Sequence, residues 1–152
     1  MKLTLKTISL CLFFLNAFGS AQSITDRSQL NKMPDIVWTD NIRLADFLKR
    51  LKIPIKCLGY IYHEGSEQAS TITLRFENRA EHNKLKQKNM RPATVNLFFN
   101  NDEATKSAFK VFNKRYGYVE GDSVDVALKN LRDLKIVYSI IYGDTYRSDG
   151  SL

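Results

Sequence analysis

The sequence has few of the residues that build disulfide scaffolds, metal sites and catalytic centres. It has 2 cysteines and 2 histidines among 152 residues. Cys11 lies in a hydrophobic N-terminal segment that we expect to be removed, so Cys57 has no partner for an internal disulfide. His63 and His82 are too sparse to supply the three or four ligands of a usual zinc site. We therefore expect no disulfide framework, no metal ion and no other cofactor.

Long hydrophobic segments and glycine-rich loops are also missing. The apolar stretch from Thr7 to Phe18 is well short of the ~20 residues that span a membrane as a helix, and no later stretch approaches that length. No segment has the glycine spacing of a phosphate-binding loop. We therefore expect no transmembrane segment in the mature chain.

The N-terminal segment has the three-part pattern of a secretory signal peptide. Two lysines precede a hydrophobic core, and the small residues Gly19 and Ala21 then stand where a signal peptidase cleaves. We interpret residues 1–21 as a leader and Gln22 as the first residue of the mature protein. The protein is then exported, to the periplasm or to the extracellular space. An uncleaved signal anchor is the alternative.

The chain is moderately basic. It has 23 Lys and Arg against 16 Asp and Glu, for a formal net charge of +7, and the loss of two lysines with the leader leaves it positive. A positive surface favours anionic partners, such as acidic proteins or the anionic polymers of a cell envelope. Export argues against nucleic acid as a partner.

Hydrophobic periodicity predicts one small α+β domain over residues 39–146, after a flexible lead-in at 22–38 and before a polar tail at 147–152. The predicted elements are, in chain order, a helix over 40–52, strands over 55–63, 70–77 and 94–99, helices that begin near Asn101 and Asp122, and a strand over 135–142. The order α-β-β-β-α-α-β predicts a four-stranded, mainly antiparallel sheet with helices packed on one face.

Three local patterns refine this prediction. Ile72, Leu74 and Phe76 alternate with polar residues, which indicates a strand with one solvated face. Gly117 is expected to end the second helix in the left-handed conformation. Residues 78–91 have few apolar and many charged side chains, and we expect an exposed long loop or frayed helix there.

Two surfaces are candidates for binding. The first is the basic segment between two predicted strands: Arg79, Lys84, Lys86, Lys88 and Arg91. The second is the polar sheet face with its out-of-pattern phenylalanine: Thr71, Thr73, Arg75 and Phe98. A phenylalanine exposed among Thr and Arg suits a protein partner. The alternatives are that the basic segment is merely solvated, and that the lead-in near Trp38 or the tail covers Phe98.

Cys57 is the residue with the greatest intrinsic reactivity. Its position in the predicted strand has the same parity as Ile55 and Ile61, so we expect it in the core as a small hydrophobic side chain. His63 stands six residues along the same strand, roughly 20 Å away at the usual rise, which excludes a direct pair. We predict no catalytic residue.

The lack of a catalytic constellation and the two exposed surfaces favour an exported, non-enzymatic binding protein that recognises another protein. A periplasmic inhibitor or immunity-type role fits these features. One alternative is a small secreted hydrolase or cell-wall-active enzyme that uses His63 or His82 with an acid such as Asp122. Another is an envelope-associated protein that binds anionic polymers.

Overall fold

The computed structural model of the protein describes residues 23–32, 36–37, 42–63, 68–142 and 145–146. The predicted signal peptide, the polar tail and Trp38 lie outside these residues. The described helices are η1 (Arg27–Lys32, a 3₁₀ helix), α2 (Leu44–Arg50), α3 (Arg79–Gln87), α4 (Glu103–Phe109) and α5 (Asp122–Leu131). The described strands are β1 (Ile36–Val37), β2 (Cys57–Ile61), β3 (Ser70–Arg75), β4 (Met90–Arg91), β5 (Thr94–Phe99), β6 (Tyr116–Glu120), β7 (Ile136–Tyr142) and β8 (Thr145–Tyr146).

Within the described residues, six strands form one sheet in the order β1-β7-β5-β3-β2-β6, and every neighbouring pair is antiparallel. The predicted α+β class and antiparallel sheet are confirmed. The predicted number of four strands is wrong, because β1 and β6 extend the sheet at its two edges. β4 and β8 form a separate two-stranded ribbon.

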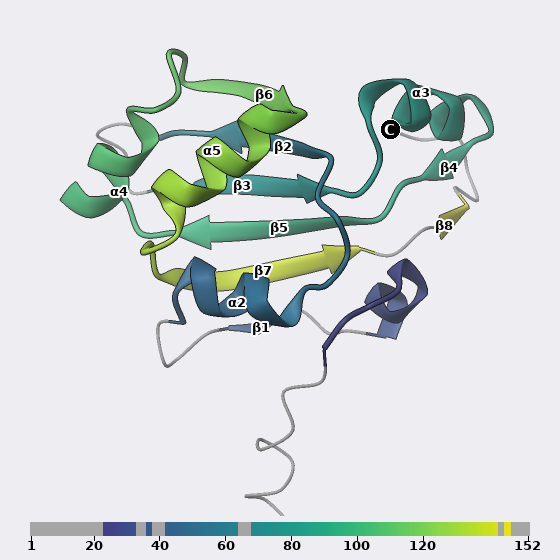
Figure 1. Ribbon diagram of the computed structural model, residues 1–152, viewed down its shortest axis with the longest axis horizontal. Coiled ribbons are helices and arrows are strands. Elements are labelled where there is room, and N and C mark those ends of the chain that lie inside the picture. Colours follow the sequence, from purple (N-terminus) through teal and green to yellow (C-terminus); the bar gives the residue numbers. More distant parts are fainter. Residues whose placement is uncertain (1–22, 33–35, 38–41, 64–67, 143–144, 147–152) are drawn as a thin grey trace, which may run out of the picture.

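The hydrophobic core lies between this sheet and the helices α2, α4 and α5, which cover one face of it (Figure 1). The alternation in β3 and β5 sends their apolar side chains to that face, where Ile72, Leu74 and Leu97 are fully buried. Phe99 packs edge to face on Phe109 of α4. No helix in the described part of the chain is long and apolar enough to cross a membrane.

Part of the predicted lead-in packs on the domain. Leu30 in η1 is fully buried, and Ile24 is 7% exposed. The Ile24 backbone joins the segment after α2, since Ile24 N donates to Arg50 O at 2.8 Å and Lys52 N donates to Ile24 O at 2.8 Å. Residues 24 and 30 therefore contribute to the folded core, although they precede the predicted domain boundary.

The charged segment 78–91 is mainly a helix, where a long loop or frayed helix was predicted. Helix α3 begins with a capping box: the Asn78 side chain accepts a hydrogen bond from Glu81 N at 2.9 Å, and the Glu81 carboxylate accepts one from Asn78 N at 3.0 Å. Two backbone donors that have no partner within the helix are thus satisfied at its first turn. Asn89 follows the helix with a φ of 57°, a conformation that asparagine tolerates. The predicted exposure is correct, because α3 has no buried residue.

Gly117 lies inside strand β6, so the prediction that it ends a helix is wrong. Helix α4 ends earlier, at Phe109, and a turn leads from it into β6. Gly117 is opposite Tyr60 of β2, where an added Cβ would meet the Tyr60 hydroxyl oxygen at 2.7 Å. The glycine therefore permits close contact with an aromatic ring.

Candidate functional site

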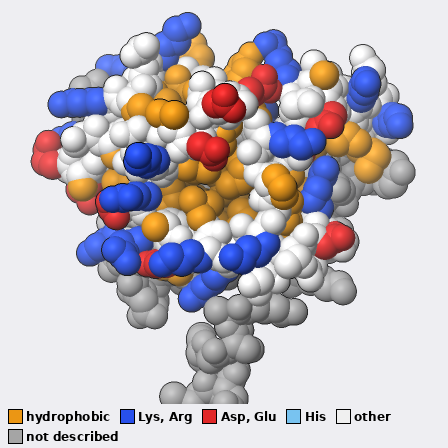
Figure 2. Space-filling view, in the orientation of Figure 1, with side chains coloured by type: hydrophobic (Ala, Val, Ile, Leu, Met, Phe, Trp, Pro, Cys, Tyr) orange, Lys and Arg blue, Asp and Glu red, His pale blue; other side chains and the backbone are white. Residues whose placement is uncertain are grey.

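Helices α2, α4 and α5 leave the second face of the sheet free, and α3 reaches this face only at one end, where Arg79 contacts Tyr118. Figure 2 shows the opposite, helix-bearing side, where Lys and Arg side chains surround a hydrophobic centre. Strand register places the outward side chains of this helix-free face in rows. We define the helix-free face by Ile61, Thr71, Thr73, Arg75, Asn96, Phe98, Tyr116, Tyr118 and Tyr138.

The structure brings together the four residues predicted on the polar sheet face. Thr71 stands opposite Phe98, and Thr73 stands opposite Asn96. The Thr73 hydroxyl donates to Asn96 Oδ1 at 2.8 Å. Phe98 stacks on Tyr138 with ring centroids 4.0 Å apart. Arg75 lies one row further along β3, and all four predicted residues are half-buried.

The most exposed apolar side chains of the helix-free face lie at its β2–β6 edge. Tyr116 is 74% exposed, and Ile61 and Tyr118 are each 47% exposed. Register places Ile61 directly opposite Tyr116, with Tyr118 in the next row. Sequence reasoning missed this group, because it assigned Ile61 to the core and did not recognise β6 as a strand.

The residues of the predicted basic segment divide between two positions. Lys84, Lys86 and Lys88 are exposed on or just after α3. Arg79 and Arg91 instead contact tyrosines: the Arg79 guanidinium lies 5.2 Å from the ring centroid of Tyr118, and that of Arg91 lies 3.8 Å from the ring centroid of Tyr142. Arg79 Nη1 also donates to the Tyr118 hydroxyl.

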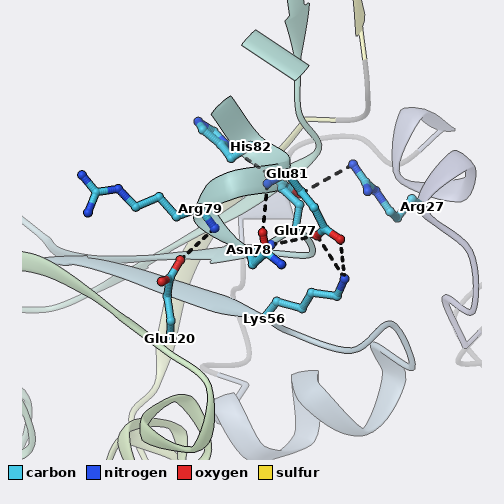
Figure 3. A network of polar contacts seen from close by, with 8 residues as sticks. All are labelled: Arg27, Lys56, Glu77, Asn78, Arg79, Glu81, His82 and Glu120. Atoms are coloured by element: carbon cyan, nitrogen blue, oxygen red, sulfur yellow. Dashed lines mark hydrogen bonds and ion pairs between the residues drawn. The ribbon is translucent and has the colours of Figure 1, made fainter. Parts of the chain in front are cut away.

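A polar network joins the start of α3 to η1, to β6 and to the segment that follows β3 (Figure 3). Glu77 is 1% exposed, and its carboxylate lies 3.1 Å from His82 Nδ1 and 3.5 Å from Arg27 Nη2. His82 Nδ1 is the donor, because a carboxylate only accepts. Arg79 N donates to Glu120 Oε1 of β6 at 2.8 Å. The buried charge of Glu77 is thus paired, as burial requires.

A second set of contacts holds α3 at its first turn. Lys56 Nζ lies 3.0 Å from Glu81 Oε2. The pKa of Glu81 is lowered, first by the hydrogen bond from the Asn78 backbone and then by the Lys56 ammonium group. The carboxylate therefore stays charged where the capping box needs it.

Cys57 is buried, as predicted, but on the opposite side of the sheet from the core. It is 3% exposed and does not belong to the main hydrophobic cluster, and register places it between Arg75 and Glu120. The parity argument therefore assigned the wrong face to both Cys57 and Ile61. Burial raises the pKa of the Cys57 thiol; Arg75 opposes the rise.

The geometry does not form a nucleophile–base pair from these residues. Cys57 and His82 line the same small pocket, but no hydrogen bond joins them, and the Nδ1 atom of His82 is in contact with Glu77. A thiol with a raised pKa carries little of the thiolate that nucleophilic attack requires. Ser123 lies in the first turn of α5, with no described contact to either histidine. In the described ranges, no group of three or more His, Cys, Asp or Glu side chains gathers to hold a metal ion.

No protein-family model, no curated protein and no solved structure matches this chain.

Proposed function

We propose that this chain is an exported, non-enzymatic protein that binds another protein through the helix-free face. The observation that carries the proposal is the exposed group of Ile61, Tyr116 and Tyr118, which adjoins the rows of Thr71 and Thr73. A periplasmic inhibitor or immunity-type role is consistent with such a surface.

The composition of this surface suits a protein partner. Tyrosine gives a large apolar contact area at a low entropy cost and keeps a hydroxyl for hydrogen bonding, which is why interfaces are rich in it. Contiguous exposed apolar side chains on a small protein commonly mark an interaction site. Tyr116, Ile61 and Tyr118 are neighbours by register, so a partner can cover all three at once.

The charges at one end of the face indicate an acidic partner. Arg75 lies on the face, and Arg79 and Arg91 lie over the rings of Tyr118 and Tyr142. An arginine held against a ring loses less side-chain freedom when it binds, so the cost of association is smaller. Complementary charge also raises the rate of encounter.

Strand β6 adds backbone groups to this surface. Among the described residues, β6 pairs on one side only, with β2. Tyr62 N donates to Arg115 O at 2.6 Å, so the alternation of an antiparallel ladder directs the backbone groups of Tyr116, Tyr118 and Glu120 away from β2. An extended segment of the partner can therefore pair with this edge.

A capture experiment with matched variants tests the proposal. The full chain and two variants are used to capture proteins from envelope fractions of the native organism. In one variant, Ile61→Thr and Tyr116→Thr remove the exposed apolar contacts but keep residues that favour strands. The control, Val126→Thr, changes a side chain that is 58% exposed on α5.

We expect the double variant to capture its partner at least about tenfold less well, because central aromatic and aliphatic anchors carry much of a binding energy. The control should capture as the unchanged chain does. Equal capture by all three proteins would contradict the use of this face.

Binding of anionic envelope polymers is the second candidate, favoured by the exposed lysines of the α3 region. Lys84, Lys86 and Lys88 have no ion-pair partner within the described residues. A variant with all three changed to Glu should lose retention by envelope fractions at low salt if the polymer is the target. Unchanged retention would remove this candidate and leave the protein partner.

A further inference from the structure

A small polar pocket lies where the first turns of α3 meet the ends of β2, β3 and β6. Its volume is about 200 Å³. Three lining side chains are cationic and two are carboxylates; the lining residues are Cys57, Arg75, Glu77, Arg79, His82, Asn83, Lys86, Tyr118 and Glu120. Six of these residues lie within 75–86, and the other three come from β2 and β6, so the pocket forms only when these segments come together.

The two carboxylates of the pocket already have partners. Glu77 contacts His82 at 3.1 Å and Arg27 at 3.5 Å. Glu120 Oε1 accepts a hydrogen bond from Arg79 N at 2.8 Å. Among the described residues, neither carboxylate forms an ion pair with Arg75, Arg79 or Lys86, although Glu77 Oε2 is buried without a hydrogen bond.

The Arg75 side chain, in contrast to these carboxylates, has a buried donor without a partner. Its Nε atom is buried and makes no hydrogen bond, and no described carboxylate forms an ion pair with its guanidinium or with the Lys86 ammonium. A buried donor without an acceptor is costly, so buried polar groups that lack a protein partner commonly face a ligand or an ordered water. The arrangement thus offers donors to a group that accepts.

The charge and shape of the pocket select the acceptor. The three Lys and Arg side chains of its lining outnumber its two carboxylates, which favours an anionic group. The planar fork of an arginine pairs with the two oxygens of a carboxylate. A space of about 200 Å³ is several times the ≈ 30 Å³ share of one water molecule, enough for a carboxylate on a short side chain.

We propose that this pocket binds a carboxylate group, with Arg75 as its main hydrogen-bond donor and with Arg79 and Lys86 at its rim. The carboxylate comes either from a small free acid or from the acidic side chain or C-terminus of a protein. Cys57 forms one wall as an uncharged thiol, so it does not repel an anion. The pocket shares Arg75, Arg79 and Tyr118 with the proposed protein-binding face, but the inference does not rest on that proposal, because a small acid can bind in the pocket without contact to Ile61 or Tyr116.

Protection of Cys57 from alkylation tests the proposal in the full chain. The neutral reagent iodoacetamide is used, and mass spectrometry of the Cys57 peptide separates its reaction from that of Cys11. The added probes are acetate, succinate, a short peptide that ends in Asp, its amidated form with Asn in place of Asp, inorganic phosphate, and chloride at matched ionic strength.

We expect a carboxylate probe to slow alkylation at least threefold at saturation, whereas chloride and the amidated Asn peptide have no effect. Protection by acetate or succinate identifies a small acid as a sufficient ligand, and protection by the acidic peptide alone identifies a protein carboxylate. Both results support the proposal. Stronger protection by phosphate, or no protection by any carboxylate, overturns it.

Two variants connect the protection to the pocket. Arg75→Gln should abolish protection, and Lys86→Gln, which changes an exposed side chain of α3, should weaken it without unfolding the protein. The control Lys88→Gln changes an exposed lysine that does not line the pocket, so it should leave protection unchanged. Equal protection of the unchanged chain, Arg75→Gln and Lys86→Gln would contradict the assignment, and circular dichroism establishes that each variant is folded.

Discussion

Replacement of Gly117 by alanine probes the packing that holds β6, and with it the exposed tyrosines, at the edge of the sheet. The new Cβ would lie 2.7 Å from Tyr60 Oη and 3.0 Å from Tyr60 Cζ, well inside the roughly 3.5 Å of an unstrained contact. Tyr60 is 9% exposed, and its ring stacks on Phe112 with centroids 3.8 Å apart. The ring therefore has to move against a packed neighbour.

The expected cost follows from two opposing terms. Overpacking of a well-packed site costs about 1–3 kcal/mol, and removal of a strand glycine returns about 0.5–1 kcal/mol through the backbone entropy of the unfolded chain. We expect Gly117→Ala to lower the free energy of unfolding by about 1–2 kcal/mol. For a chain of this size, the midpoint of thermal unfolding should fall by about 2–8 °C.

Gly59→Ala is the matched control on the neighbouring strand. Its added Cβ would lie 3.5 Å from Thr73 Cβ, an ordinary contact, so we expect stability to be unchanged or raised by up to about 1 kcal/mol. Adding Tyr60→Phe to Gly117→Ala removes the nearest clashing atom and should recover part of the loss. Urea and thermal unfolding measure all four proteins; equal stability of the two alanine variants would refute the position of Tyr60 over Gly117.

Three further predictions concern the start of α3. Asn78→Ala removes the side-chain cap and should cost about 1 kcal/mol of unfolding free energy, measured by urea unfolding. Glu77→Gln removes the buried charge that faces Arg27 and His82 and should cost about 1–2 kcal/mol, less than a fully buried pair because Arg27 is 30% exposed; retention of full stability would argue against the pair. The pKa of Glu81 is lowered in the folded protein. The Glu81 carboxylate therefore stabilises the fold at pH values above the usual glutamate pKa of about 4.3, and this contribution is lost as the pH falls through the pKa of the folded state. Glu81→Gln should therefore flatten the acid side of the pH–stability profile, and an unchanged profile would exclude this contribution.

Strong local patterns account for the parts of the fold that could be predicted. The alternation at Val95 and Leu97 predicted a strand over 94–99, and these are the observed bounds of β5. The helix predicted to begin near Asp122 is α5, which begins at that residue. The capping box that begins α3 is also a local signal, since Asn78 precedes Glu81 by three residues. The prediction did not use this signal and relied on the scarcity of apolar side chains, although an exposed helix needs only a narrow apolar stripe.

The parts that could not be predicted depend on contacts between distant segments. Strand β6 is short and contains Gly117, and only its pairing with β2 makes it a strand. The face of the sheet on which Cys57 lies depends on where β2 begins and how it pairs. Ile55 precedes β2, so the alternation counted from Ile55 did not determine this face. The pocket beside α3 joins Arg75 to Glu120, and no spacing in the sequence indicates that they meet.

Site-specific photocrosslinking in the living native organism tests most directly whether the helix-free face binds a protein. A photoreactive amino acid replaces Tyr116 in one protein and Val126 in another, two exposed positions on the β6 edge and on α5. The account predicts a discrete crosslinked protein adduct from position 116 and none from position 126. Adducts of equal yield from both positions, or an adduct from position 126 alone, would contradict it.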